Sequence, residues 1–180
     1  MGRKLVQTQC FQWFRVILRC PDRCCQFFKK NASRNLDLCS LFRVMKAFGK
    51  VMVEAGYGRI INIASAMGMV GNLGVPLAGY QAAKGGVINL TRAAAAEWAT
   101  QGVTVNNICP SMFPSESNGA DLMEESQTFI KRMTPMQRAG TPTDLNTVGD
   151  MDAAVVFLAS EESRYITGIT LPCDGGWTCV

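Results

Sequence analysis

Hydrophobic residues recur every three or four positions between residues 38 and 53, and this spacing predicts an amphipathic helix that ends at Gly56. A second, alanine-rich helix is predicted from Tyr80 to Thr100, before Gly102. Each helix is followed by an apolar, β-branched run, 59–64 and 103–108, which predicts a buried strand. Residues 110–150 read mostly as loop with a helical piece around 122–133, followed by a short apolar helix at 153–159 and a strand at 169–173.

This alternation of helices and strands predicts an α/β domain with a parallel sheet. Ligands of such sheets bind at the carboxyl ends of the strands, so Ser65, which directly follows the first predicted strand, is well placed for chemistry. Residues 1–34 show no clean period. We therefore expect residues 35–180 to form the domain and residues 1–34 to be a basic, cysteine-rich extension outside the fold.

Charge is distributed unevenly along the 180 residues. Residues 1–34 hold eight basic residues against Asp22 alone, a charge of +7, so the rest of the chain carries −3 of the net +4. A basic stretch with interleaved aromatic residues can bind nucleic acid or an anionic membrane, or act as a transit peptide. No recognised nucleic-acid motif accompanies it, which favours an unrelated extension and predicts neither nucleic-acid nor membrane partners.

The eight cysteines are crowded toward the start of the chain, and the chain has no histidine. Cys20, Cys24 and Cys25 do not form the well-spaced pairs of a zinc site, so no metal is predicted. Incidental thiols in a reduced compartment remain the simpler interpretation. With no apolar run near the roughly 18 residues needed to cross a membrane, we expect a cytoplasmic protein.

Tyr80 and Lys84 stand four residues apart in the second predicted helix. At that spacing two side chains lie on one face of a helix, one turn apart. An ammonium held near a phenol favours the phenolate form, which makes a tyrosine usable as a general acid or base near neutral pH. Most such pairs are plain surface contacts, so the pair alone does not decide between the two interpretations.

The surrounding segments resemble blocks of the short-chain dehydrogenase/reductase family, in the family's order, over residues 35–180. The central blocks are Gly58-Arg-Ile-Ile-Asn-Ile-Ala-Ser65, a glycine-rich loop, and Tyr80-x-x-x-Lys84 followed by Gly-Gly-Val-Ile-Asn-Leu-Thr. The later blocks are Gly102-Val-Thr-Val-Asn-Asn-Ile-Cys-Pro110, Phe157-Leu-Ala-Ser160, Tyr165-Ile-Thr-Gly168 and Asp174-Gly-Gly-Trp177. Within the family, the blocks around Tyr80 and Pro110 look most like polyol or gluconate dehydrogenases and 3-oxoacyl reductases.

The resemblance implies a Rossmann-like sheet flanked by helices and an oxidoreductase that moves hydride between NAD or NADP and a carbonyl or secondary alcohol. Tyr80 would exchange a proton with the substrate oxygen, Lys84 would assist the tyrosine and hold the nicotinamide ribose, and Ser65 would orient that oxygen. Asn35 matches the asparagine that shapes a proton-relay water. Pro110 and, in place of the usual threonine, Ser115 would contact the cofactor.

Three of these residues also have a structural interpretation. Asn35 is a suitable cap for the following helix, Ser65 an ordinary residue at a strand end, and Ser115 a loop hydroxyl. The Asp174-Gly-Gly segment is expected to be a structural turn beside the carboxyl ends of the strands.

The family's glycine-rich turn between its first strand and first helix, which binds the cofactor pyrophosphate, has no counterpart in this sequence. Gly68, Gly71 and Gly74 have the wrong spacing and follow the strand that carries Ser65. We therefore expect a truncated sheet whose first βαβ units are missing, and weak binding of NAD or NADP. A second hypothesis is a non-catalytic remnant. It would keep the helices near 38–55 and 80–100, through which family members commonly form homo-oligomers, and act as an interaction module.

Overall fold

The computed structural model describes residues 34–71, 77–114, 126–144 and 147–180. The predicted extension up to residue 33 and the candidate residue Ser115 lie outside these ranges. In chain order the described elements are η1 (Arg34–Ser40), α2 (Leu41–Ala55), β1 (Gly58–Ile63), η2 (Ala66–Gly68), α3 (Ala78–Trp98), η3 (Ala99–Gln101), β2 (Val103–Pro110), α5 (Gln127–Met133), α6 (Asp152–Ala159), η5 (Glu161–Ser163), β3 (Thr170–Cys173) and η6 (Trp177–Cys179).

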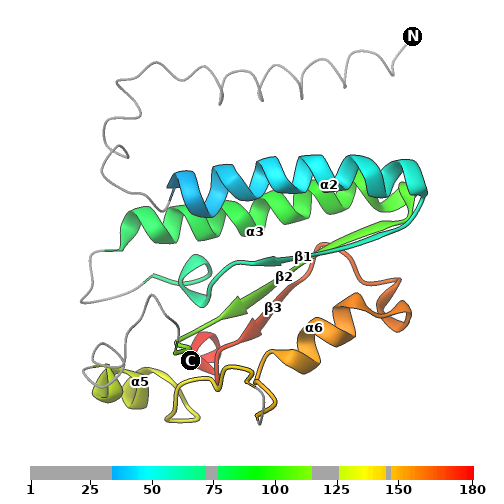
Figure 1. The fold of residues 1–180 in the computed structure, drawn as a ribbon. Coiled ribbons are helices and arrows are strands. Elements are labelled where there is room, and N and C mark those ends of the chain that lie inside the picture. The colour runs from blue at the N-terminus through cyan, green and yellow to red at the C-terminus, as the bar shows by residue number, and fades with distance from the viewer. Residues whose placement is uncertain (1–33, 72–76, 115–125, 145–146) are drawn as a thin grey trace, which may run out of the picture. The chain divides into compact units, whose positions relative to one another are not determined.

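The described strands form one parallel sheet in the order β1-β2-β3. Gly58 pairs with Val103 at the start of β1, and Asn107 pairs with Thr170 at the start of β3. Figure 1 shows α2 and α3 side by side over one face of the sheet, with α6 on the opposite face. The prediction of an α/β domain with a parallel sheet and flanking helices is confirmed.

The main core lies between the two long helices and the sheet. Its buried residues come from α2, α3 and β2, namely Met45, Ala94, Ala95, Val103 and Val105. Gly49 allows α2 to approach α3, because a Cβ at this position would collide with the Trp98 ring. On α3 the buried Ala94 and Ala95 face this core, and their small side chains allow the helix to lie close to β2.

A buried polar network crosses this core. The Asn62 side-chain amide donates to Thr91 Oγ1 at 2.7 Å, and Thr91 Oγ1 donates to Asn107 Oδ1 at 2.7 Å. Asn107 Nδ2 in turn donates to the Ile88 carbonyl at 3.4 Å. Asn62, Thr91 and Asn107 are almost completely inaccessible to solvent. The network fixes β1, α3 and β2 to one another close to the carboxyl ends of both strands.

The first predicted helix differs from the structure at its start. The sequence pattern predicted one continuous helix, whereas the structure has the π-helical segment η1 before α2. Because η1 begins at Arg34, the backbone of Asn35 lies inside a helical segment, one residue after its start. The predicted end is confirmed, with Gly56 in the left-handed conformation at φ 68°.

The short apolar helix α6 is less enclosed than its sequence suggests. Leu158 is buried, but Val156 is 68% exposed because only one side of the helix faces the sheet. Of the helices in the described ranges, none is long and apolar enough to cross a membrane.

Candidate active site

Ser65 stands immediately beyond the carboxyl end of β1. The backbone N–H of Ala64 donates to the Ile108 carbonyl at 2.9 Å, so the β1–β2 pairing continues to the residue before the serine. Ser65 Oγ accepts the Met67 backbone N–H at 3.2 Å and caps the turn η2. A hydroxyl that accepts one hydrogen bond keeps its own proton available for another acceptor. The capping contact therefore fixes this side chain without using its O–H.

Tyr80 and Lys84 lie in the first two turns of α3, which the sequence predicted as one face of a helix. Lys84 Nζ is 5.7 Å from the centroid of the Tyr80 ring. It also donates to the Ile63 carbonyl at 3.3 Å and forms an ion pair with Asp37 Oδ1 at 3.3 Å. The ammonium thus connects the tyrosine, the last residue of β1 and the segment η1.

Gly68 sets how closely the Ser65 turn approaches α3. A Cβ at Gly68 would lie 2.7 Å from the Lys84 carbonyl carbon and 2.8 Å from the Gly85 nitrogen. Both neighbours are backbone atoms of a helix, so they cannot rotate away as a side chain would. The contact holds the turn that Ser65 caps directly against the part of α3 that carries Lys84.

Gly68→Ala is therefore expected to lower the free energy of unfolding by about 2 to 3 kcal/mol, because an extra methyl group must displace backbone. Gly71→Ala is the matched control, since a Cβ at Gly71 would meet no atom of the described residues within 4 Å. Urea denaturation of both variants measures the difference. A Gly68→Ala variant as stable as Gly71→Ala would show that the turn does not rest on α3 as described.

Tyr80 also borders an apolar cluster. Its buried members are Ala66, Met67 and Trp177, and the partly buried residues packed against them are Leu77, Tyr80, Met112, Phe129 and Met133. The Phe129 and Trp177 rings meet edge to face with their centroids 5.7 Å apart. Residues from η2, α3, α5 and the C-terminal turn thus form a wall that keeps water from one side of the tyrosine.

Cys109, in β2, has a thiol that contacts the Ser65 backbone. Burial raises the pKa of Cys109 to about 11, although the contact with the Ser65 backbone opposes this change. A thiol with such a pKa stays protonated at neutral pH and is a poor nucleophile. Cys109 is therefore a buried core residue and not a candidate nucleophile.

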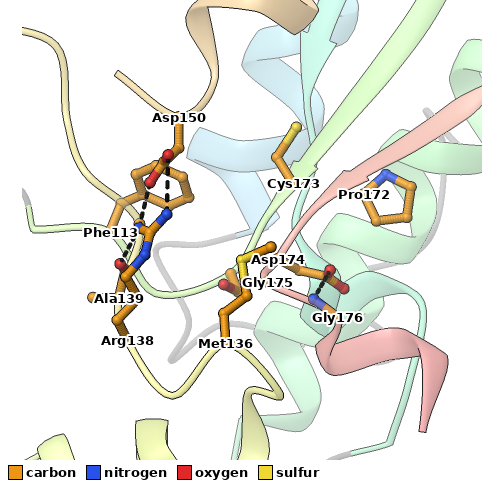
Figure 2. Close-up of a pocket in the computed structure, with 12 residues that line it drawn as sticks. Phe113, Met136, Arg138, Ala139, Asp150, Pro172, Cys173, Asp174, Gly175 and Gly176 are labelled. Carbon is orange, nitrogen blue, oxygen red and sulfur yellow. Dashed lines mark hydrogen bonds and ion pairs between the residues drawn. The ribbon is translucent and has the colours of Figure 1, made fainter. Parts of the chain in front are cut away.

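A cavity of about 370 Å³ opens at the carboxyl ends of the neighbouring strands β2 and β3. Figure 2 shows its lining, which includes the turn Asp174–Gly176 and the paired Arg138 and Asp150. The Asp174 carboxylate accepts hydrogen bonds from the backbone N–H groups of Gly176 and Thr178, each at 2.9 Å, and these bonds stabilise the turn. Ser65, Tyr80 and Lys84 do not line the cavity. At β1 and α3, by contrast, a phenol lies beside an ammonium, with Lys84 Nζ facing the Tyr80 ring.

The Arg138–Asp150 pair closes one side of this cavity. Two hydrogen bonds of 2.6 and 3.2 Å join the guanidinium to the carboxylate, and the Thr141 backbone N–H donates to the same carboxylate at 2.8 Å. The hydrogen bond from Arg138 and that from Thr141 hold the pKa of Asp150 well below its ordinary range. The pair remains charged at all physiological pH values and fixes the loop around Gly140 beside β2.

The structure places the predicted residues as follows. Tyr80 and Lys84 lie together, and Ser65 is held against the same helix through its turn. Pro110 ends β2 opposite Cys173, next to the cavity. The Asn35 side chain and Ser115 lie outside the described part of the chain.

Two features were missed by the sequence interpretation, namely Asp37 beside Lys84 and the pair Arg138–Asp150. The opposite charges were visible in the sequence, but nothing there indicates which acidic residue meets which base.

A family model described as enoyl-(acyl carrier protein) reductase matches residues 30–178. The chain belongs to the short-chain dehydrogenase/reductase family. A 3-oxoacyl-[acyl-carrier-protein] reductase of Vibrio cholerae is 41% identical over 140 residues, which cover 78% of this chain and 54% of the relative. A galactitol 2-dehydrogenase of Cereibacter sphaeroides is 40% identical over 146 residues, covering 80% and 54%.

Among solved structures, a gluconate 5-dehydrogenase of Burkholderia cenocepacia in complex with NADP and tartrate superimposes with a TM-score of 0.70. It is 32% identical and is matched over 82% of this chain and 55% of its own. The described sheet and helices therefore have the Rossmann-like arrangement of this oxidoreductase family. The chain spans about half the length of the curated relatives it matches.

Proposed function

We propose that residues 35–180 are the catalytic part of an NAD(P)-dependent oxidoreductase that interconverts a carbonyl and a secondary alcohol. The observation that carries this proposal is the cluster at the carboxyl end of β1. There, Tyr80 and Lys84 lie one turn apart on α3, against the turn that Ser65 caps. Two elements thus bring a proton donor, a cation and a hydroxyl to the sheet edge where ligands of parallel sheets bind.

In the direction of reduction, the Tyr80 hydroxyl gives its proton to the carbonyl oxygen while hydride reaches the carbonyl carbon. The Ser65 O–H, which its capping contact leaves available, donates to the same oxygen and orients it. Lys84 stabilises the tyrosine oxygen after the proton has left. The apolar cluster beside Tyr80 excludes water from the reacting groups.

A nicotinamide cofactor would supply the hydride when bound. The described donors suit its nicotinamide ribose, since an ammonium has three N–H groups and Lys84 uses two of them on Asp37 and Ile63. Pro110 and Ser115 would stand beside the nicotinamide. No segment of this sequence resembles the glycine-rich turn that binds the cofactor pyrophosphate in the family. We therefore expect weak binding of NAD or NADP.

The substrate is a small carbonyl compound or secondary alcohol. The relatives named above act on 3-oxoacyl groups and on sugar-derived alcohols, and both carry the carbonyl or hydroxyl carbon that this chemistry requires. In this proposal the cluster around Tyr80 contacts the reacting oxygen, which 3-oxoacyl groups and sugar-derived alcohols have in common.

A second candidate function is self-association through α2. Val44, Phe48 and Val51 follow one another at helical spacing and are 52%, 62% and 63% exposed. An apolar stripe of this kind on a helix suits burial against a second copy of the chain. Together with α3, α2 would then form the contact of a homo-oligomer, with or without catalysis.

The test compares the chain with a chimera in which the front half of the Cereibacter galactitol dehydrogenase is joined before Asn35. Both are titrated calorimetrically with NADH and NADPH and assayed with an acetoacetyl thioester and a ketose. We expect the chimera to bind cofactor and reduce one of these substrates, and the chain alone to bind weakly. A micromolar Kd for the chain alone would contradict the expected weak binding. A folded chimera that binds neither cofactor would favour the interaction module.

A further inference from the structure

The Lys84 ammonium is held from two sides. Asp37 Oδ1 lies 3.3 Å from Nζ, and the Ile63 carbonyl accepts from Nζ at 3.3 Å. The lysine side chain is only 13% exposed and the aspartate 21%. An ion pair that is largely withdrawn from water is less screened than a surface pair and restrains both side chains more firmly. The ammonium that faces the Tyr80 ring therefore has a defined position before any ligand arrives.

The segment that carries Asp37 has its own anchor. Leu38 packs against the buried cluster Ala64, Val87, Ile88 and Cys109, and it touches α3 where Gly86 leaves room. A Cβ at Gly86 would lie 2.9 Å from Leu38 Cδ2. With Leu38 seated in this way, the preceding residue is held over the start of α3, where Lys84 lies.

The backbone of this segment is unusual. Arg34–Ser40 is a π-helical segment, and its wider turn changes which side chains face the neighbouring helix. π-Helical segments are rare in proteins, and those that occur are often found at functional sites. Continuing α2 backward with ordinary α-helical geometry would give Asp37 a different direction. The π-helical turn and the ion pair are thus separate observations that point to one role.

We propose that Asp37 is a positioning residue that holds the Lys84 ammonium beside Tyr80 and leaves one N–H for a ligand diol such as a nucleotide ribose. The proposal rests on the proposed function, because the ligand is the nicotinamide cofactor. Asp37 acts through Lys84 and touches no reacting atom. If the ion pair served only to stabilise the fold, its loss would change the stability of the protein but not the reactivity of Lys84 or its contact with the ligand.

The first measurement is the rate at which each lysine of the full chain is acetylated by a limiting acetylating reagent, read by peptide mass spectrometry. Lys84 must leave Asp37 and Ile63 before its nitrogen can react, so Asp37→Ala should raise its rate about fivefold to tenfold. Lys46 and Lys50 on α2 serve as internal references and should not change. An unchanged Lys84 rate in a folded Asp37→Ala variant would overturn the proposal.

Two further variants complete the design. Asp37→Asn keeps an acceptor oxygen and the shape of the side chain but loses the charge, and should give an intermediate Lys84 rate. It also keeps the test decisive if Asp37→Ala does not fold. Glu54→Ala is the matched control, because Glu54 pairs with the exposed Lys50 at 3.9 Å. This variant should leave Lys84 acetylation unchanged, and a rise at Lys84 equal to that in Asp37→Ala would also overturn the proposal.

The second measurement adds NADH. In the unmodified chain, NADH should slow acetylation of Lys84, and Asp37→Ala should raise the NADH concentration needed for half protection about fivefold. Equal protection in the two proteins would overturn the positioning role. If NADH protects no lysine in the unmodified chain, the proposed cofactor binding fails for this chain. In that case the acetylation rate of Lys84 alone decides whether Asp37 positions the lysine.

Discussion

Tyr80→Phe is expected to lower kcat/KM for carbonyl reduction by about 10² to 10⁴ in the chimera that carries a complete cofactor site. The substitution removes one hydroxyl and keeps the ring that packs against the apolar cluster of Ala66, Met67 and Trp177. Cofactor affinity should stay nearly the same, because the Lys84 ammonium remains in place. Steady-state rates and a calorimetric Kd for the same protein separate the two effects.

The physical reason is that, in the proposed mechanism, Ser65 orients the carbonyl oxygen and Lys84 stabilises the tyrosine, so neither replaces Tyr80 as the acid. The chain has no histidine, and burial keeps the Cys109 thiol protonated. Tyr165→Phe is the matched control, since Tyr165 is fully exposed far along the chain and its hydroxyl serves no described contact. If Tyr80→Phe reacts as fast as Tyr165→Phe, Tyr80 is a packing residue and the assignment of the site is wrong.

The sequence predicted those helices and strands whose apolar residues recur regularly because they all face one buried surface. Met45, Met52 and Val53 on α2 recur at helical spacing because they pack into the core between the helices and the sheet. The position of Ser65 could also be predicted, because an apolar strand ends two residues earlier and parallel strands present their carboxyl ends to ligands. Periodicity therefore located the two elements that carry the site, and the Tyr80–Lys84 spacing located the pair itself.

The contacts between these elements could not be predicted in the same way. Asp37 reaches Lys84 from the π-helical segment η1, and the α-helical spacing of the following residues contains no sign of this change in backbone. Gly68 looked like a loop glycine of unsuitable spacing, whereas its role is the close approach of two backbones. Both depend on which segments meet in space, which a local pattern does not encode.

Polar residues inside the predicted apolar segments were equally uninformative. A threonine in a helix and two asparagines in strands are compatible with solvent-facing positions. The structure instead joins Asn62, Thr91 and Asn107 into one chain of hydrogen bonds in the core. This series of hydrogen bonds matters for the candidate site. Asn62 lies in β1 shortly before Ser65, and Thr91 lies in the same helix as Tyr80 and Lys84.

Thr91→Val is therefore expected to lower the free energy of unfolding by about 2 to 4 kcal/mol. Valine has nearly the same shape as threonine, so no cavity forms and only the hydroxyl is lost. Among the described residues, the Asn62 amide N–H group then keeps its 3.1 Å contact with the Met45 sulfur, a weak acceptor, and Asn107 Oδ1 loses the hydroxyl that donates to it. Two buried amides in a region of low dielectric constant lose much of their hydrogen bonding, which costs more than a single surface contact.

Thr104→Val provides the matched control, because the Thr104 hydroxyl is buried without a hydrogen-bond partner among the described residues. Replacing it by a methyl group removes an unsatisfied polar atom from a strand that favours β-branched residues, so stability should be unchanged or slightly higher. Urea denaturation of the two variants, monitored by tryptophan fluorescence, measures the contrast. Equal stabilities for Thr91→Val and Thr104→Val would mean that the network does not hold β1 against α3. The alignment of Ser65 with Tyr80 would then depend on the Gly68 contact instead.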